Sequence, residues 1–139
     1  ERPPPIPHIL LTIRQPKRRN IGRVLVNQGE VEEVMKKGNM LTWTAADMGS
    51  MSFGEQISFV RKANVLVGMH GAGLMWVLFL ADEAVLVEIH PSYRLDRHFR
   101  HAARLSGKHY LPMRAGDKIE CVGTSDRITI DIAEFTCGP

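Results

Sequence analysis

Apolar positions along the chain recur with two different periods, which predict strands and helices in alternation. Continuous apolar runs typical of buried strands span residues 8–13, 64–68 and 84–89. Apolar residues at helical spacing predict amphipathic helices that begin at Asn27 and Ser52, one over residues 95–105, and a short helix over 74–80. Because the predicted strands and helices alternate, the chain is expected to be built from βα units.

Two of the predicted helices begin with the same polar signal. Asn27 is followed three residues later by Glu30, and Ser52 is followed by Glu55. At this spacing the first side chain can accept a hydrogen bond from the backbone of the third helical residue, and the acid can reach back in return. Each pair therefore predicts a capping box.

The remaining local signals are weaker. Short apolar stretches at residues 40–43 and 109–113 predict two further strands, and residues 127–135 alternate as a strand would, yet equally fit the start of a helix. Gly38 and Gly107 follow the first and third predicted helices. Glycine is common just past a helix end, so both are expected to terminate their helices.

The strands at residues 64–68 and 84–89 are apolar throughout rather than at every second position. A strand buried on both faces has this composition, which favours a parallel sheet covered by helices on each side. The predicted fold class is therefore α/β, a Rossmann-like parallel sheet with helices on both faces. The proline-rich residues 1–7 are expected to be a linker or a truncated boundary, and residues 8–135 a single lobe.

The composition is that of one globular domain. The chain has 139 residues, of which 44% are hydrophobic and 24% charged. No apolar run approaches the about 20 residues that a membrane span needs. The first residues have neither a basic leader nor a cleavage site, so a signal peptide is not expected there. Cys121 and Cys137 fit no metal-binding spacing and are expected to be free thiols.

The net charge is only +3, but the basic residues are clustered. One cluster consists of Arg14, Lys17, Arg18, Arg19 and Arg23, and a second of Arg94, Arg97, Arg100, Arg104 and Lys108. Such clusters attract phosphate groups, and the alternative interpretation is that they are solvated faces. A nucleic-acid partner is not expected, because the clusters contain no interleaved aromatic residues and the chain has no recognition motif.

A glycine-rich turn interrupts the apolar run of residues 65–80, VLVGMHGAGLMWVLFL. His70, Gly71, Ala72 and Gly73 follow a predicted strand and precede a predicted helix. Glycines at that point let a ligand approach the backbone, and the N–H groups at the helix start attract phosphate. The histidine can add a hydrogen bond to a phosphate oxygen. The alternative is a tight turn in which the glycines serve packing and His70 is a satisfied buried residue.

Two charged residues strengthen the interpretation as a ligand site. Glu88 lies inside the next apolar run, 18 residues after His70, where an acid is costly to bury without partners. In nucleotide-binding sheets an acid at about this spacing meets the ribose hydroxyls. A carboxylate paired with a nearby arginine is the alternative. Arg14 follows the first predicted strand, and its guanidinium suits a diphosphate.

These elements together resemble glycosyltransferase family 61. The matching segments are RVLVNQGEVEEV (23–34), SFGEQISFVRKANVLVGMHGAGL (52–74), LFL (78–80) and AVLVEI (84–89). The segment RHFRHAARLSGKHYLPM (97–113) is similar to the branch that contains the EGF-domain-specific O-linked N-acetylglucosamine transferases. Plant xylosyltransferases share the same block. The resemblance extends from Leu10 to Met113.

The resemblance implies that residues 8–135 are the nucleotide-sugar-binding lobe, the C-terminal half of a GT-B-like enzyme. It implies that Arg14 and Arg23 approach the diphosphate of a UDP-sugar. It also implies that His70, Gly71, Ala72 and Gly73 form the phosphate loop, with His70 stabilising the leaving group, and that Glu88 meets the ribose or the uracil.

The activity implied is transfer of N-acetylglucosamine or xylose, with inversion, to a hydroxyl of a protein or glycan. The partners implied are the UDP-sugar, the acceptor and an N-terminal lobe that would hold the base, in a full-length form that is membrane-anchored in the endoplasmic reticulum or Golgi. No cofactor is expected and metal is not required, since no Asp-x-Asp motif is present. His98 and His101, with His90 and His109, form an alternative but weak zinc pattern.

The sequence departs from the family pattern beside the turn. Met75 and Trp76 replace a small hydroxyl residue, and Ala81 replaces a proline. These departures keep open a second interpretation, in which the chain is a non-catalytic nucleotide-binding or degenerate domain.

Overall fold

The computed structural model describes residues 6–13, 25–38, 42–90 and 97–114 with their side chains, and the backbone alone of residues 24, 119–122 and 125–128. Its centre is a five-stranded sheet in which all neighbouring strands are parallel. In sheet order the strands are β3 (Thr42–Ala46), β1 (His8–Thr12), β4 (Val65–Met69), β5 (Val85–His90) and β6 (His109–Arg114).

The chain runs from β1 outward to β3, then crosses back to β4 and continues to β5 and β6. The strand order therefore reverses between β1 and β4. In open α/β sheets a ligand crevice lies at such a reversal, beyond the carboxyl ends of the strands. The residues that follow β1 and β4 are consequently the first place to look for a site.

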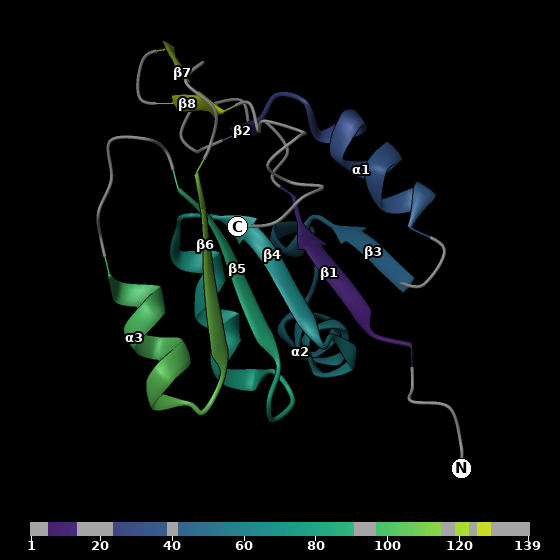
Figure 1. The fold of residues 1–139 in the computed structure, drawn as a ribbon, viewed down its shortest axis with the longest axis vertical. Coiled ribbons are helices and arrows are strands. Elements are labelled where there is room, and N and C mark those ends of the chain that lie inside the picture. Colours follow the sequence, from purple (N-terminus) through teal and green to yellow (C-terminus); the bar gives the residue numbers. More distant parts are fainter. Residues whose placement is uncertain are drawn as a thin grey trace.

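Helices cover both faces of this sheet, as the sequence predicts (Figure 1). The helices are α1 (Gln28–Lys37), α2 (Phe53–Lys62), the 3₁₀ helix η2 (Ala72–Phe79) and α3 (His98–Leu105). Helix α1 packs on one face, and α2, η2 and α3 pack on the other. None of the helices in the described part of the chain is long and apolar enough to cross a bilayer.

Each face has its own hydrophobic core. The core under α1 combines Val31 and Met35 of the helix with Leu11, Val67, Val87 and Ile89 of the sheet. The core on the other face is built around Leu10, Leu66 and Leu86, which occupy one rung across β1, β4 and β5. Residues two positions further along these strands point to the same face, one rung nearer the carboxyl edge. Thr12, Gly68 and Glu88 occupy that rung.

Most predicted elements are present, with shifted ends. The strand predicted at residues 40–43 corresponds to β3, described from Thr42, while residues 40 and 41 lie outside the described residues. The short helix after β4 is a 3₁₀ helix that begins at Ala72.

The structure also has a second sheet, in the order β2 (Val24–Leu25), β8 (Ser125–Ile128) and β7 (Ile119–Val122), and a 3₁₀ turn η1 (Met48–Ser50). The strand alternative for residues 127–135 overlaps β8 at residues 127–128, and residues 129–135 lie outside the described residues. The other elements of this sheet and η1 were not predicted. In Figure 1 the small sheet lies beyond the carboxyl ends of the large one.

The two predicted capping boxes have different outcomes. At the start of α2, Ser52 Oγ accepts from the Glu55 backbone N–H and the Glu55 carboxylate accepts from the Ser52 N–H at 2.8 Å, so this box is confirmed. At the start of α1, the Asn27 side chain makes no cap hydrogen bond and instead donates to the Glu30 carboxylate at 3.1 Å. The box predicted at Asn27 is therefore wrong, because the two side chains bond to each other.

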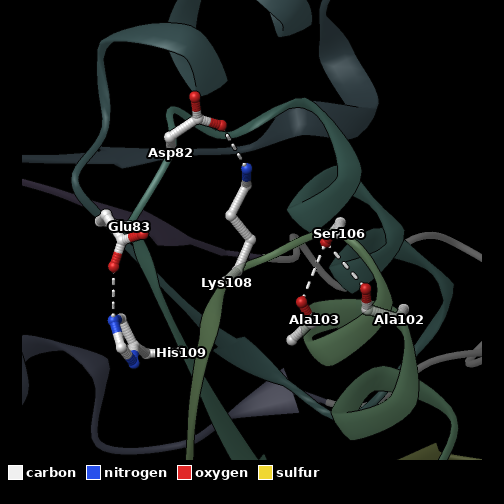
Figure 2. Close-up of polar contacts among 7 residues, drawn as sticks. All are labelled: Asp82, Glu83, Ala102, Ala103, Ser106, Lys108 and His109. Atoms are coloured by element: carbon white, nitrogen blue, oxygen red, sulfur yellow. Dashed lines mark hydrogen bonds and ion pairs between the residues drawn. The ribbon is translucent and has the colours of Figure 1, made fainter.

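The second basic cluster is not one solvated face. The Lys108 side chain is only 5% exposed, and its ammonium donates to Asp82 at 3.1 Å, as Figure 2 shows. This pair joins the turn before β5 to the end of α3, at the amino edge of the sheet. Arg97, Arg100 and Arg104 are exposed. Arg94 and the whole first cluster lie outside the described residues.

Candidate functional site

The turn after β4 places backbone N–H groups that have no partner within the helix at the carboxyl edge of the sheet. The His70 N–H donates to Ile89 O on β5 at 2.9 Å, which continues the strand pairing past Met69. The first bond of η2 is donated by Leu74 N–H to Gly71 O at 2.9 Å, so the N–H groups of Ala72 and Gly73 have no partner inside the helix. Ala72 and Gly73 are exposed, whereas His70 is buried.

Gly68 serves packing rather than ligand approach. A Cβ atom at this position would lie 2.3 Å from Thr12 Oγ1 and 2.8 Å from Leu74 Cδ2. The hydroxyl of Thr12 donates to Val67 O at 3.2 Å, which holds the end of β1 against β4. The missing side chain at Gly68 therefore lets β1 and η2 close on β4. For this glycine the packing interpretation of the motif is the correct one.

Glu88 is fully buried and is paired with the histidine of the turn. Its side chain has 0% exposure, and Glu88 Oε1 accepts a hydrogen bond from His70 Nδ1. Gly68 is its register partner on β4, so no side chain separates Glu88 from the turn that follows. Among the described residues, the partner of this buried carboxylate on the turn is thus a histidine. Arg14, which follows β1 in the chain, lies outside the described residues, so the arginine alternative stays untested.

Two further side chains reach the same carboxylate. The Tyr110 hydroxyl donates to Glu88 Oε2 at 2.7 Å, and His90 Nε2 lies 2.8 Å from that hydroxyl and 3.2 Å from Glu88 Oε2. The His70 and His90 rings stack with 5.6 Å between their centres, and Phe99 of α3 meets His70 edge-on at 5.3 Å. A polar cluster therefore lies directly under the turn, with His70 and Glu88 buried and His90 and Tyr110 partly buried.

The cluster favours an ionised carboxylate. Burial alone would raise the pKa of Glu88, but the hydrogen bonds from its three partners outweigh burial and hold that pKa below its ordinary value. Burial and the adjacent carboxylate raise the pKa of the Tyr110 hydroxyl, which therefore remains a donor. The Glu88 carboxylate thus places a buried negative charge in the sheet, beside Gly68 and just before the glycine turn.

Three of these residues also have the chemistry of a metal site. Ligand atoms of His70, Glu88 and His90 lie within 4.8 Å of one another, and two imidazoles with one carboxylate suit a transition metal. The same atoms are already joined by hydrogen bonds within the cluster. The pattern of His98 and His101 with His109 is not among the metal-binding groups that the described residues form.

The structure brings some of the sequence-predicted site residues together. His70 and Glu88 are in contact, and Gly71, Ala72 and Gly73 form the turn beside them. Arg14 and Arg23 lie outside the described residues, so their approach to a diphosphate stays a prediction. The contact of Glu88 with ribose or uracil also stays a prediction. In this structure both of its oxygens are engaged by side chains.

Sequence reasoning missed His90 and Tyr110 as members of the site. His90 lies two residues after Glu88 on the same strand, and residues at that spacing share a face of a sheet. This signal was available from the sequence. No comparable local signal identifies Tyr110, because its contact with Glu88 depends on β6 pairing beside β5.

Comparison with known proteins identifies the family of this chain. The family model described as Glycosyltransferase 61 matches residues 3–87, which include β1, the turn after β4 and the first half of β5. An EGF domain-specific O-linked N-acetylglucosamine transferase of Gallus gallus is 33% identical over 99 residues, 70% of this chain and 18% of that protein. The Xenopus laevis protein of the same name is 39% identical over 69 residues, 50% of this chain and 13% of its own length.

A relative with a different name matches over a longer stretch. A protein O-linked-mannose beta-1,4-N-acetylglucosaminyltransferase 2 of Takifugu rubripes is 30% identical over 114 residues, 78% of this chain and 19% of that protein. The chain therefore spans less than a fifth of the length of these curated relatives.

Proposed function

The chain belongs to glycosyltransferase family 61, and from this membership we propose that it is the donor-binding lobe of a glycosyltransferase that uses a UDP-sugar. N-acetylglucosamine is the sugar in the names of the relatives, so we propose it as the transferred group, ahead of xylose. The proposed acceptor is a hydroxyl of a protein or of a protein-linked glycan.

The turn between β4 and η2 is the observation that carries this proposal. It lies at the carboxyl edge, beside the reversal of strand order between β1 and β4. Ala72 and Gly73 are exposed, and their N–H groups stand at a helix start, where the helix dipole favours an anion. A diphosphate is the part of a nucleotide sugar that such a turn would bind.

His70 would add the charged contact. Its Nδ1 donates to Glu88, which fixes the ring directly beside the turn. In its protonated form the imidazolium donates from both nitrogens, and the buried carboxylate offsets its positive charge. A protonated His70 would therefore stabilise the negative charge that develops on the departing UDP.

The proposed reaction is a single displacement with inversion. The acceptor oxygen forms a bond to C1 of the sugar as the bond from C1 to the diphosphate oxygen breaks, and UDP leaves with the electron pair. The acceptor proton passes to a base that we place outside this chain, in a second lobe. Arg14 and Arg23 remain proposed contacts of the leaving diphosphate. The proposal assigns no metal to this step.

We also propose that the whole protein acts in the endoplasmic reticulum or the Golgi, where proteins are O-glycosylated. A second lobe that binds the acceptor and a membrane anchor are part of this proposal. The match to about a fifth of each relative's length is consistent with further domains.

Calorimetric titration with UDP tests the proposal. The titration is made with this chain and with the intact protein, with and without Mn²⁺, and is repeated with uridine. We expect binding of UDP with one site per chain, and much weaker binding of uridine. Failure of the folded intact protein to bind UDP would end the proposal for a donor lobe.

A non-catalytic nucleotide-binding domain is the second candidate. Met75, exposed on η2 two residues after Gly73, stands where the family often has a hydroxyl residue. Binding of UDP without sugar transfer by the intact protein would favour this candidate. Transfer that is lost on substitution of His70 would favour the enzyme.

A further inference from the structure

We propose that the outer side of η2, together with the first residue of α2, is the surface on which the second lobe of the intact protein docks. This apolar patch consists of Phe53, Met75, Leu78 and Phe79, with Trp76 between them. The inference rests on the proposed function for the existence of a second lobe, and it names the part of this chain that the lobe contacts.

The composition of η2 is unusual for a helix at a surface. All eight of its residues, AGLMWVLF, are apolar or glycine. A surface helix normally has a polar side, whereas a helix that is apolar all round is normally buried all round. Yet η2 buries only Leu74 and Val77, which pack into the core on the sheet. Within the described part of the chain, one apolar side of this helix therefore lacks the cover that its composition predicts.

The exposed side chains form one continuous patch. Phe53 is 64% exposed, and Met75, Leu78 and Phe79 are 43%, 46% and 44% exposed. The centre of the Trp76 ring is 5.6 Å from that of Phe53 and 5.6 Å from that of Phe79, so the three rings join α2 to η2. Met75 and Leu78 are three residues apart and lie one above the other on a 3₁₀ helix. The patch is therefore a preformed surface and not a scatter of single apolar residues.

The patch begins beside the proposed donor turn. Helices α2 and η2 each follow a strand of the parallel sheet, so both begin at its carboxyl edge. Phe53 is the first residue of α2, and Met75 follows Gly73 by two residues. A lobe that covers the patch therefore also stands next to Ala72 and Gly73, where it can present an acceptor to the sugar.

The size of the patch favours a partner within the same polypeptide. Aromatic side chains bury about 150–250 Å² each, so the exposed parts of the four patch residues amount to roughly 400 Å². A stable complex of separate proteins buries about 800 Å² on each side. Two lobes of one polypeptide associate through a smaller contact, because their linkage gives them a high effective concentration. The patch is therefore too small for a stable dimer by itself and sufficient for a tethered lobe.

The chemistry expected of the docking lobe follows from the patch. No charged residue belongs to the patch, so aliphatic and aromatic side chains of the lobe complement it. The curated relatives extend far beyond the part that matches this chain, which spans less than a fifth of their length. An intact protein of similar length has ample polypeptide for such a lobe.

Cysteine labelling of the intact protein tests the inference. Single cysteines replace Leu78 or Phe53 in the patch. The control is Glu33→Cys, because Glu33 is exposed on α1, which packs on the opposite face of the sheet. Mass spectrometry reads the attachment of a maleimide at each position separately, so that Cys121 and Cys137 do not interfere. We expect Leu78→Cys and Phe53→Cys to react at least about tenfold more slowly than Glu33→Cys.

The same variants of this chain alone identify the source of the protection. Urea unfolding first shows that each variant unfolds cooperatively. In the absence of a second lobe, we expect the patch cysteines to react about as fast as Glu33→Cys. Slow labelling of the patch in the chain alone would show that the chain covers this surface itself, and would overturn the docking of a lobe.

The remaining outcomes assign the patch to other occupants. In the intact protein, labelling of both patch positions as fast as the control would overturn the inference. Protection that grows with protein concentration would overturn it in favour of a second copy. Protection that appears only when phosphatidylcholine vesicles are added would overturn it in favour of a membrane surface.

The labelling reactions contain no nucleotide, so this inference and the proposed function fail in different ways. A protected patch in an intact protein that binds no UDP would keep the docking surface and refute the donor function. An accessible patch in an intact protein that binds UDP would refute the docking surface alone.

Discussion

The imidazole of His70 is hydrogen-bonded to the carboxylate of Glu88 across β4 and β5, and both side chains are buried beneath an exposed glycine turn. A pair of this kind is costly to take out of water and is held in place only by further hydrogen bonds. Tyr110 and His90 supply those bonds. The pair therefore ties the carboxyl edge of the sheet to the turn that follows β4.

Replacement of Glu88 by Gln should damage both stability and binding. The amide places a donor or a weaker acceptor among groups that donate, and an uncompensated imidazole remains buried. We expect a loss of about 2–4 kcal/mol in the free energy of unfolding. UDP affinity should fall about tenfold or more. Urea unfolding and calorimetric titration measure the two effects.

Glu83→Gln is the control for this substitution. Glu83 is exposed and pairs with His109 on the surface. The free energy of unfolding of Glu83→Gln should stay within about 0.5 kcal/mol of that of the wild type. A Glu88→Gln variant as stable as this control would show that the buried pair contributes little to the free energy of unfolding.

The pH dependence of stability should carry the signature of Glu88. Its pKa in the folded chain is below the ordinary value of 4.5, so between the two values the unfolded chain binds the extra proton. The stabilisation is complete above 4.5 and is lost as the pH falls through the folded pKa. We expect the difference in unfolding free energy between wild type and Glu88→Gln to shrink as urea titrations move from pH 7 to pH 3.

Glu33→Gln provides the comparison for the acid titration. Glu33 also has a lowered pKa, because it accepts a hydrogen bond from Lys36, but the pair is on the surface. The free energy of unfolding of Glu33→Gln should follow that of the wild type from pH 7 to pH 3. A constant gap between Glu88→Gln and wild type down to pH 3 would mean that Glu88 does not titrate in this range.

Gly68→Ala should destabilise the chain because the new methyl group has no room. It would meet Thr12 Oγ1 at 2.3 Å and Leu74 Cδ2 at 2.8 Å, so β1 or η2 must shift. Strain of this kind costs about 1–3 kcal/mol. The shift also moves the turn, so UDP binding should weaken in proportion. Thermal and urea unfolding measure the first effect, and calorimetry the second.

Gly54→Ala is the matched substitution in an open position. No atom lies within 4 Å of a Cβ at Gly54 in α2, and alanine favours a helix over glycine by up to about 1 kcal/mol. This variant should be as stable as the wild type or more so. Equal effects of the two substitutions would contradict the packing role of Gly68.

The sequence predicted the parts of the fold that depend on local pattern. The apolar runs of β1, β4 and β5 identify buried strands without reference to one another, and Ser52 with Glu55 marks the start of α2. Asn27 carries the same signal but bonds to Glu30 instead, because either arrangement satisfies both side chains. Local pattern alone does not choose between them.

The site was predictable only in part, for a related reason. His70 and the glycines stand out because they interrupt an apolar run, and Glu88 because it is an acid inside one. The polar partners that make Glu88 tolerable come from a different strand, and only the pairing of β5 with β6 brings Tyr110 within 2.7 Å. The packing role of Gly68 likewise depends on Thr12, which lies 56 residues earlier.

The most direct test of the central claim is the change in backbone amide resonances of the ¹⁵N-labelled chain on titration with UDP and, separately, with uridine. The account predicts that the amides of Ala72 and Gly73 shift most with UDP, in step with the His70 ring, and stay unchanged with uridine. Saturable binding of UDP that leaves these two amides unmoved would contradict it.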